Sequence, residues 1–175
     1  FRNTILNIIK DFETFEITSE PKLKVGIVGE ILVKYHPTAN NNVISLVESE
    51  GAEAVVPDLI DFFMYSAYGD FKYRYLSGTK IEQLSHRFLI GIMELYRVTY
   101  RNALKASGRF FPPQSIYKTA EGASKILSLG HQMGEGWLLT GEMIELLEQG
   151  INNIICMQPF ACLPNHVTGK GMLRE

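Results

Sequence analysis

The segment from residue 23 to residue 57 constrains the fold most, because it has the pattern of two strands joined by one helix. Its first part, Leu23–Glu30, is rich in β-branched residues and ends in Gly-Glu, which is typical of a buried parallel strand. A helix is predicted over 40–50, between an asparagine cluster and Gly51. Residues 52–57 form a second predicted strand. A strand, a helix and a strand within about 33 residues make a unit whose two strands run parallel.

A third strand is predicted at 151–157, and the chain between the second and third strands has a helical pattern instead. Its longest predicted helix is amphipathic and is broken at Gly108. Two more helices are predicted at about 116–129 and 135–148. The apolar stripe of the long helix consists of Ile81, Leu84, Phe88, Ile92, Leu95 and Thr99.

These elements predict an α/β fold, with a small parallel Rossmann-like or flavodoxin-like sheet of order 2-1-3 and a large helical insertion at about 62–148. Residues 1–21 are predicted to be an N-terminal helix and linker, and residues 22–175 one α/β lobe. The chain begins at Phe1 without a methionine and ends where a helix beginning at Val167 is predicted to continue. We therefore expect it to be part of a larger multidomain protein.

Composition restricts the partners and the compartment. Of the 175 residues, 46% are hydrophobic and 21% are charged, which is typical of a folded domain. The net charge of −2 argues against recruitment of nucleic acid or of an anionic membrane by bulk charge. No run of about 18 apolar residues predicts a membrane span. Two cysteines cannot form a disulfide framework, so we expect reduced thiols and a cytoplasmic protein.

A sheet of order 2-1-3 places its topological switch point at the carboxyl ends of the first and third strands, where open α/β sheets bind ligands. Two loops are predicted to meet there, at 29–37 and at 158–166. We expect the functional site between them. Within the first loop, Lys34 and His36 are expected to be solvated.

Cys162 is the strongest candidate in the second loop. It stands between Pro159 and Pro164, just before a predicted helix, whose positive end would favour the thiolate that binds metals or acts as a nucleophile. The alternative is a loop cysteine that packs as a small apolar group. Cys156 lies within the predicted third strand and is expected in the core. Two cysteines cannot complete a four-thiolate site.

Four further residues complete the predicted site. Glu30, on the first loop, is the candidate acid or base, and its alternative role is to cap a helix or form an ion pair. His166 is a candidate ligand, acid or base, or hydrogen-bond partner, with helix capping as its alternative. Gly169 and Gly171 flank a lysine in half of a phosphate-loop pattern, where backbone N–H groups could hold an anion such as a phosphate of coenzyme A.

An aromatic cluster near the start of the insertion is predicted to be a packed or partner-facing surface, because few basic residues interleave it as an RNA-binding platform would require. Its members are Phe62, Phe63, Tyr65, Tyr68, Phe71, Tyr73 and Tyr75.

Two segments carry a family resemblance: QPFACLPNHV at 158–167 and VGEILVKYHPTANN at 28–41. With them, the chain resembles the D-component-like family of 2-hydroxyacyl-CoA dehydratases. It is most similar to long bacterial proteins described as activators of (R)-2-hydroxyglutaryl-CoA dehydratase, which join such a region to ATPase-type activase domains. The resemblance covers most of residues 22–175.

The resemblance implies an anaerobic electron-transfer system. In this family an activase injects one low-potential electron into a cysteine-ligated iron–sulfur cluster, which enables radical dehydration or reduction of an acyl-CoA. Cys162 matches the family's cluster-binding cysteine. The ATPase motifs and the remaining cluster cysteines are absent from this chain. We therefore expect the cluster only in the full-length protein, and expect the isolated chain to be inactive.

The expected partners are the remaining lobe and the activase domains of the parent protein, with acyl-CoA as a further ligand. Two alternatives stay open: a docking module of a multidomain activase without chemistry of its own, and a lobe that binds coenzyme A without a cluster.

Overall fold

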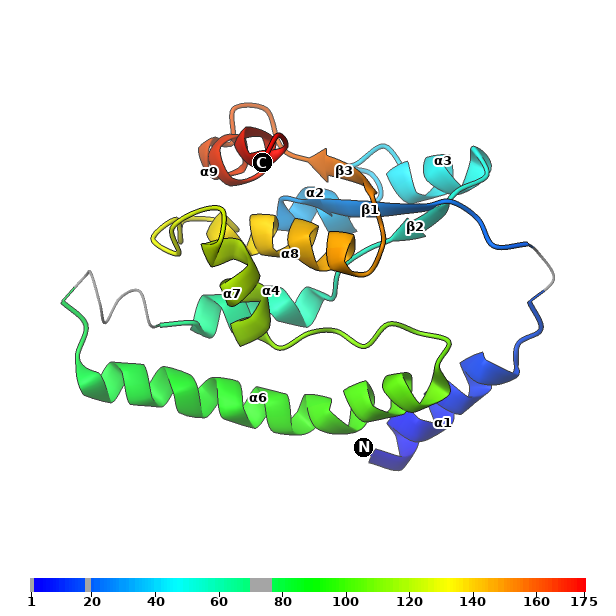
Figure 1. The fold of residues 1–175 in the computed structure, drawn as a ribbon, viewed down its shortest axis with the longest axis horizontal. Coiled ribbons are helices and arrows are strands. Elements are labelled where there is room, and N and C mark those ends of the chain that lie inside the picture. The colour runs from blue at the N-terminus through cyan, green and yellow to red at the C-terminus, as the bar shows by residue number, and fades with distance from the viewer. Residues whose placement is uncertain (1, 18–19, 70–76) are drawn as a thin grey trace.

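The sheet is three-stranded and parallel. The computed structural model describes residues 2–17, 20–69 and 77–175. Its strands are β1 (Lys24–Gly29), β2 (Glu53–Val55) and β3 (Asn153–Met157), in the order β2-β1-β3 (Figure 1). The parallel pairing of β1 with both neighbours and the 2-1-3 order are confirmed. Both predicted outer strands are shorter than expected, and β2 has only three residues.

Helices make up most of the described chain. Between β2 and β3 the described residues form α4, α6, α7 and α8, and α6 runs along one side of the molecule as its longest helix (Figure 1). No helix within the described ranges is both long enough and apolar enough to cross a membrane. The bounds are α1 Arg2–Thr14, α2 Ile31–Tyr35, α3 Val43–Ser49, α4 Leu59–Ala67, α6 Lys80–Ser107, α7 Ile116–Ser124, α8 Gly136–Glu148, α9 Leu163–Thr168 and the 3-10 turn Lys170–Met172.

Two segments predicted as loops, 29–37 and 158–166, are partly helical, and one predicted helix starts later than expected. The segment after β1 forms α2 instead of a loop. The final helix, α9, begins at Leu163, four residues before the predicted start. Pro164 lies in its first turn, where a helix accepts proline, so this proline did not mark a loop. The helix predicted over 40–50 begins only at Val43, since Asn41 and Asn42 both have left-handed backbone conformations that a helix cannot continue through.

Helix α8 forms the packing layer against β1. Val28 of β1 shares a buried apolar cluster with Leu139, Met143 and Leu146 of α8. The approach is close at Gly26, where a Cβ would lie 2.6 Å from Leu146 Cδ1. Ile27 is as fully buried as Val28, and consecutive strand residues point to opposite faces, so both faces of β1 are covered.

A second apolar cluster joins α4, α7 and α8 around Trp137. The Trp137 ring meets Tyr65 edge-on at 4.9 Å and Tyr68 at 5.1 Å between ring centroids. Phe62 packs against the same cluster, whereas Phe63 is exposed. Phe62, Tyr65 and Tyr68 are therefore packed, which is one of the two predicted alternatives. The members at 71, 73 and 75 lie outside the described residues.

The ends of α6 are defined by local chemistry. At its start, Thr79 and Glu82 form a capping box, in which each side chain accepts a hydrogen bond from the other residue's backbone N–H. Gly108, with a φ of 64°, ends the helix in the left-handed conformation that glycine adopts without strain. Helix α1 packs against α6, and Arg109 Nη1 donates to the Phe12 carbonyl at 3.0 Å, which holds the end of α1 in place.

Candidate functional site

The carboxyl ends of β1 and β3 meet as the switch-point argument requires. The backbone N–H of Glu30 donates to the Met157 carbonyl at 3.0 Å, which ties the first residue after β1 to the end of β3. The side chain of Glu30 caps α2: Oε2 accepts from the Val33 N–H at 2.8 Å. Helix capping, the alternative considered for Glu30, is therefore the contact that the structure shows. An acid or base role for Glu30 stays a prediction.

A buried hydrogen-bond network joins the two segments at this edge. Glu135 Oε1 accepts from the Ile31 N–H at 3.1 Å, and Glu135 Oε2 accepts from Asn165 Nδ2 at 2.9 Å. Asn165 Nδ2 also lies 3.2 Å from Cys162 Sγ, as a donor to sulfur. Asn165 is 0% and Glu135 7% exposed. The network thus connects the start of α2 with the thiol on the opposite segment.

Cys162 is the residue immediately before α9, with a partly exposed side chain. The preceding Ala161 has a φ of 61°, which turns the chain sharply before the helix. Besides its contact with the thiol, Asn165 has a buried Oδ1 without a hydrogen-bond partner among the described residues. The thiol is therefore held by a polar contact at the sheet edge rather than enclosed in apolar packing.

His166 lies within α9 and not at the start of a helix, so its predicted position was wrong. Its backbone N–H donates to the Cys162 carbonyl as part of the helix. Its exposed ring points to Gln158, with 3.3 Å between His166 Nδ1 and Gln158 Nε2. The ring therefore contacts the segment that carries Cys162, and a ligand role for His166 stays a prediction.

Gly169 stands between α9 and the 3-10 turn Lys170–Met172, and Gly171 lies within that turn. Gly169 ends α9, and its N–H donates to the Asn165 carbonyl at 3.0 Å. A Cβ at Gly169 would lie 2.7 Å from Leu139 Cδ2 and 2.9 Å from Cys156 Sγ. Close packing of the chain against α8 and β3 therefore explains the glycine at 169. An anion-binding role for Gly169 and Gly171 stays a prediction.

The two thiols should differ in reactivity. Cys156 lies in β3 against the apolar cluster under α8, as predicted, and burial together with the nearby Glu142 carboxylate raises the pKa of its thiol. We expect iodoacetamide at neutral pH to alkylate Cys162 well before Cys156, because alkylation requires an accessible thiolate. Mass spectrometry of peptides from a time course measures both rates. Equal rates, or faster modification of Cys156, would contradict this assignment of environments.

A second polar cluster lies beside a cavity of about 670 Å³, whose lining residues include Lys34, Asp58, Asp61, Glu142 and Glu145. Lys34 Nζ binds both carboxylate oxygens of Glu142, at 2.7 and 2.9 Å, and both side chains are 4% exposed. The expectation that Lys34 is solvated was wrong. His36 is exposed, as expected. Burial raises the pKa of Glu142, and the ammonium group of Lys34 opposes that rise.

Arg97 of α6 connects this cluster to α4. Its Nη1 lies 2.9 Å from Asp61 Oδ1, an ionic contact without the alignment of a hydrogen bond, and its Nη2 lies 3.7 Å from Asp58 Oδ2. Burial raises the pKa of Asp61 to about 7, although the Arg97 guanidinium lowers it. Asp61 therefore holds its proton to a higher pH than an ordinary aspartate does.

Stability should fall as pH rises from about 4 to about 7, because the folded Asp61 holds a proton that the unfolded chain has released. The variant Asp61→Asn mimics the neutral form. We expect it to remove up to about 4 kcal/mol of this pH-dependent change in the free energy of unfolding between pH 4 and pH 7. Urea unfolding at several pH values measures it. Glu142 and Glu145 also have raised pKa values and should keep part of the slope in the variant. An unchanged slope would show that Asp61 titrates normally.

Sequence reasoning missed Glu135, Glu142 and Arg97, and it quoted Asn165 without giving it a role.

Comparison of the chain with protein-family models, with curated proteins and with solved structures finds no match. Among the described residues, no group of three or more histidine, cysteine or acidic side chains could hold a metal ion. At the sheet edge, the described residues place the Cys162 thiol beside one hydrogen-bond donor, Asn165 Nδ2.

Proposed function

We propose that this chain is a lobe of a larger protein of the 2-hydroxyacyl-CoA dehydratase D-component type, similar to the activators of (R)-2-hydroxyglutaryl-CoA dehydratase, and that it donates Cys162 to an iron–sulfur cluster. The observation that carries the proposal is the position of the Cys162 thiol. It lies partly exposed at the carboxyl edge of the sheet, with Asn165 Nδ2 at 3.2 Å. The two motifs at 28–41 and 158–167 supply the family.

The surroundings of the thiol suit a cluster ligand. Hydrogen bonds to cysteine sulfur tune the reduction potential of iron–sulfur clusters, and Asn165 is in place to donate one. Glu135 Oε2 accepts from Asn165 Nδ2 at 2.9 Å, and Glu135 Oε1 accepts from the Ile31 N–H. Glu135 therefore fixes the position of the donor relative to the start of α2. When bound, the cluster would supply one-electron transfer at low potential.

This chain would contribute one ligand, because Cys156 lies in β3 beside Gly169 and Leu139. The other ligands would come from the remaining lobe, and ATP hydrolysis from the activase domains, of a cytoplasmic parent protein. We further propose that the three strands belong to a Rossmann-like or flavodoxin-like sheet, whose switch point presents the thiol.

A lobe that binds an acyl-CoA without a cluster is the second candidate. The cavity of about 670 Å³ has the size of a small-molecule site. It is lined by more carboxylates than cations, which is unfavourable for the phosphates of coenzyme A. The iron–sulfur proposal is therefore the one that the contacts favour.

The test is anaerobic reconstitution of the full-length parent protein, with iron and sulfide measured per chain. We expect Cys162→Ser to lose most of the bound iron and sulfide, and Cys156→Ser, the matched control, to keep the wild-type amounts. The isolated 175-residue chain should bind no stoichiometric cluster. Full iron content in Cys162→Ser would refute the proposal, as would four irons bound to the isolated chain.

A further inference from the structure

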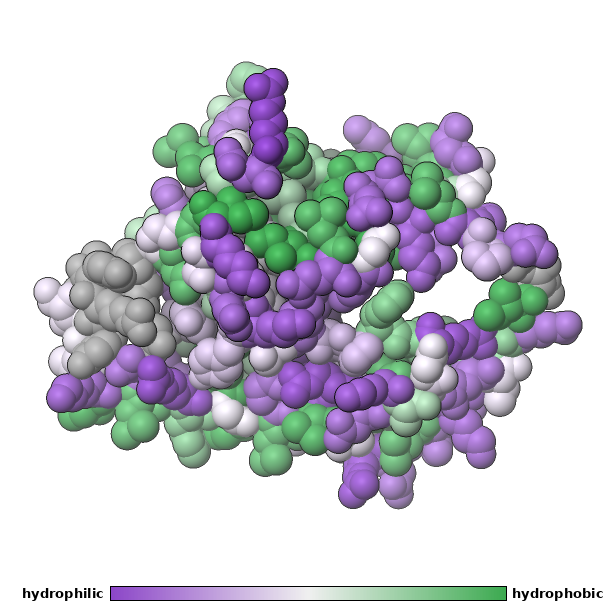
Figure 2. Space-filling view, in the orientation of Figure 1, coloured by the Kyte–Doolittle hydropathy of each residue, from purple (hydrophilic) through white to green (hydrophobic). Residues whose placement is uncertain are grey.

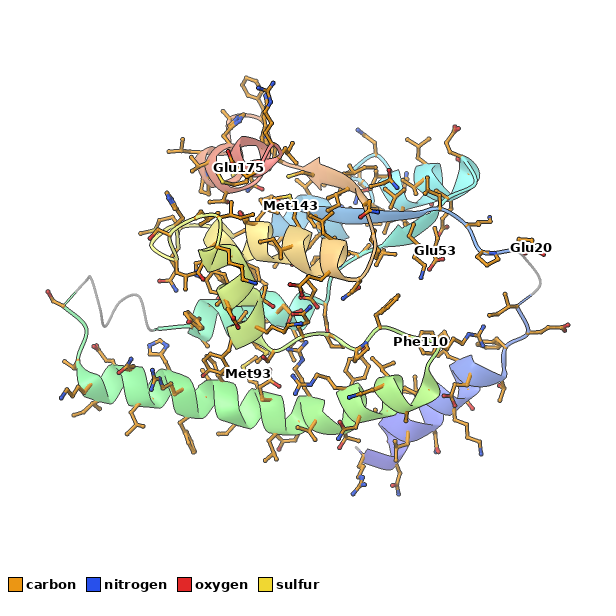
Figure 3. The ribbon with its side chains drawn as sticks, in the orientation of Figure 1. Glu20, Glu53, Met93, Phe110, Met143 and Glu175 are labelled. Carbon is orange, nitrogen blue, oxygen red and sulfur yellow. The ribbon has the colours of Figure 1, made fainter. Side chains whose placement is uncertain are left out.

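We propose that two copies of this chain pair through the outer face of α6 as an antiparallel two-helix coiled coil. This face consists of Ile81, Leu84, Phe88, Gly91, Leu95 and Val98. Their side chains point away from the rest of the molecule: Ile81 is 80%, Phe88 69% and Leu95 71% exposed. Figure 2 shows apolar side chains along the lower edge of α6, and Figure 3 shows side chains extending from that edge into solvent.

The outer face is not the side by which α6 packs in its own chain. The buried residues of α6 are Ile90, Arg97 and Leu104, which lie seven residues apart on the opposite side of the helix. Four members of the apolar stripe found in the sequence are therefore left exposed: Ile81, Leu84, Phe88 and Leu95. Helices expose so many large apolar side chains on one face chiefly where a partner covers them.

The spacing of the outer face is that of a coiled-coil seam. Ile81, Phe88 and Leu95 are seven residues apart, and Leu84, Gly91 and Val98 follow each of them by three. Alternating steps of three and four residues keep one face toward a partner helix when two helices supercoil. The seam from 81 to 98 spans roughly 26 Å of a straight helix. Its six residues in each copy would form six layers, three of them distinct under a two-fold axis.

The sizes of the residues select the antiparallel orientation. A two-fold axis between Leu89 and Ile90 places Phe88 of each copy beside Gly91 of the other. A Cβ at Gly91 would meet nothing within 4 Å in its own chain, so the space above it is free for the Phe88 ring. A parallel pair would instead place phenylalanine against phenylalanine and glycine against glycine, which leaves a void at the glycine layer.

The same axis generates the other layers. It places Ile81 beside Val98 of the second copy, and Leu84 beside Leu95 of the second copy. Such a self-complementary contact is what two-fold symmetry requires.

The charges that flank the seam do not select the register. Glu94, the acidic flanking residue, is 17% exposed and lies 2.8 Å from Arg101 and 3.8 Å from Arg97 of its own chain. The choice of orientation therefore rests on the sizes of Phe88 and Gly91.

Sedimentation equilibrium of the 175-residue chain tests the proposal. We expect a monomer–dimer equilibrium with a dissociation constant in the micromolar range. Leu95→Glu should make the chain monomeric, whereas Leu89→Glu, the same substitution at an exposed leucine of the same helix outside the seam, should leave the dimer intact. Circular dichroism should show unchanged helix content for both variants, because both side chains are exposed.

Cysteine cross-linking tests the orientation. When the variants Ile81→Cys and Val98→Cys are mixed and oxidised, an antiparallel pair should give the disulfide between positions 81 and 98, identified by peptide mapping. Disulfides joining 81 to 81 would overturn the antiparallel arrangement. A chain that stays monomeric at concentrations of hundreds of micromolar, or a dimer that Leu95→Glu does not dissociate, would overturn the proposal itself. These outcomes do not depend on whether the parent protein binds an iron–sulfur cluster.

Discussion

Replacing Lys34 with methionine should lower the free energy of unfolding by about 3–5 kcal/mol, which is the usual cost of leaving one member of a buried ion pair without its partner. Glu142 accepts two hydrogen bonds from Lys34 Nζ and is itself buried within α8. Without Lys34, its carboxylate would have no compensating charge within hydrogen-bonding distance among the residues that the structure describes. Urea denaturation at pH 7 measures the loss, and lowering the pH should restore part of it as Glu142 takes up a proton.

Two controls separate this effect from the loss of any lysine. Lys24 and Glu53 form an exposed pair with 3.8 Å between charged atoms, so Lys24→Met should change stability by less than about 1 kcal/mol. The double variant Lys34→Met/Glu142→Leu should recover most of the stability, because it removes the buried charge together with its partner. A loss equal in the two single lysine variants would show that the Lys34–Glu142 pair is not buried.

Replacing Trp137 with alanine should cost about 3–5 kcal/mol, because it empties the centre of the helical core. The side chain is fully buried and meets Tyr65 and Tyr68 edge-on. Trp137 Nε1 has no hydrogen-bond partner among the described residues, so the substitution removes packing and leaves no polar group stranded. Thermal and chemical unfolding should both report the loss.

Phe63→Ala is the matched control for this prediction. Phe63 belongs to the same aromatic segment but is more than half exposed on the outer side of α4. Its truncation should cost less than about 1 kcal/mol. If Phe63→Ala were as damaging as Trp137→Ala, the division of this segment into packed and exposed residues would be incorrect.

The sheet could be predicted because its signals are local. The β-branched run at β1, the helix that follows and the apolar run at β3 determine a parallel sheet, and crossover rules leave few strand orders. Helix ends were less predictable. Pro164 stands in the first turn of α9, and prolines on both sides of Cys162 favoured a loop over that turn.

The site was predictable in place but not in its contacts. The switch-point argument brought the segments of Glu30 and Cys162 to one edge, and the backbone bond from Glu30 to Met157 shows that edge. Glu135 was missed because it lies 104 positions from Ile31, whose N–H it accepts, and a local pattern carries no sign of such a partner. For the same reason, Lys34 was expected in solvent although Glu142, 108 positions away, holds it.

The outer face of α6 illustrates a different limit. Periodicity identified four residues of this face, but it placed Ile92 and Thr99 there instead of Gly91 and Val98. An apolar face also has the same spacing whether it packs against its own chain or against another molecule. Only the structure shows that Ile90 and Leu104 pack inward while Phe88 and Leu95 do not.

The central claim, that Cys162 is a cluster ligand, is tested most directly by an anomalous difference map at the iron edge from crystals of the anaerobically reconstituted full-length protein. We predict an iron peak at bonding distance from Cys162 Sγ, with Asn165 Nδ2 still beside the sulfur. Iron bound elsewhere in the protein, with Cys162 Sγ free of metal, would contradict the assignment.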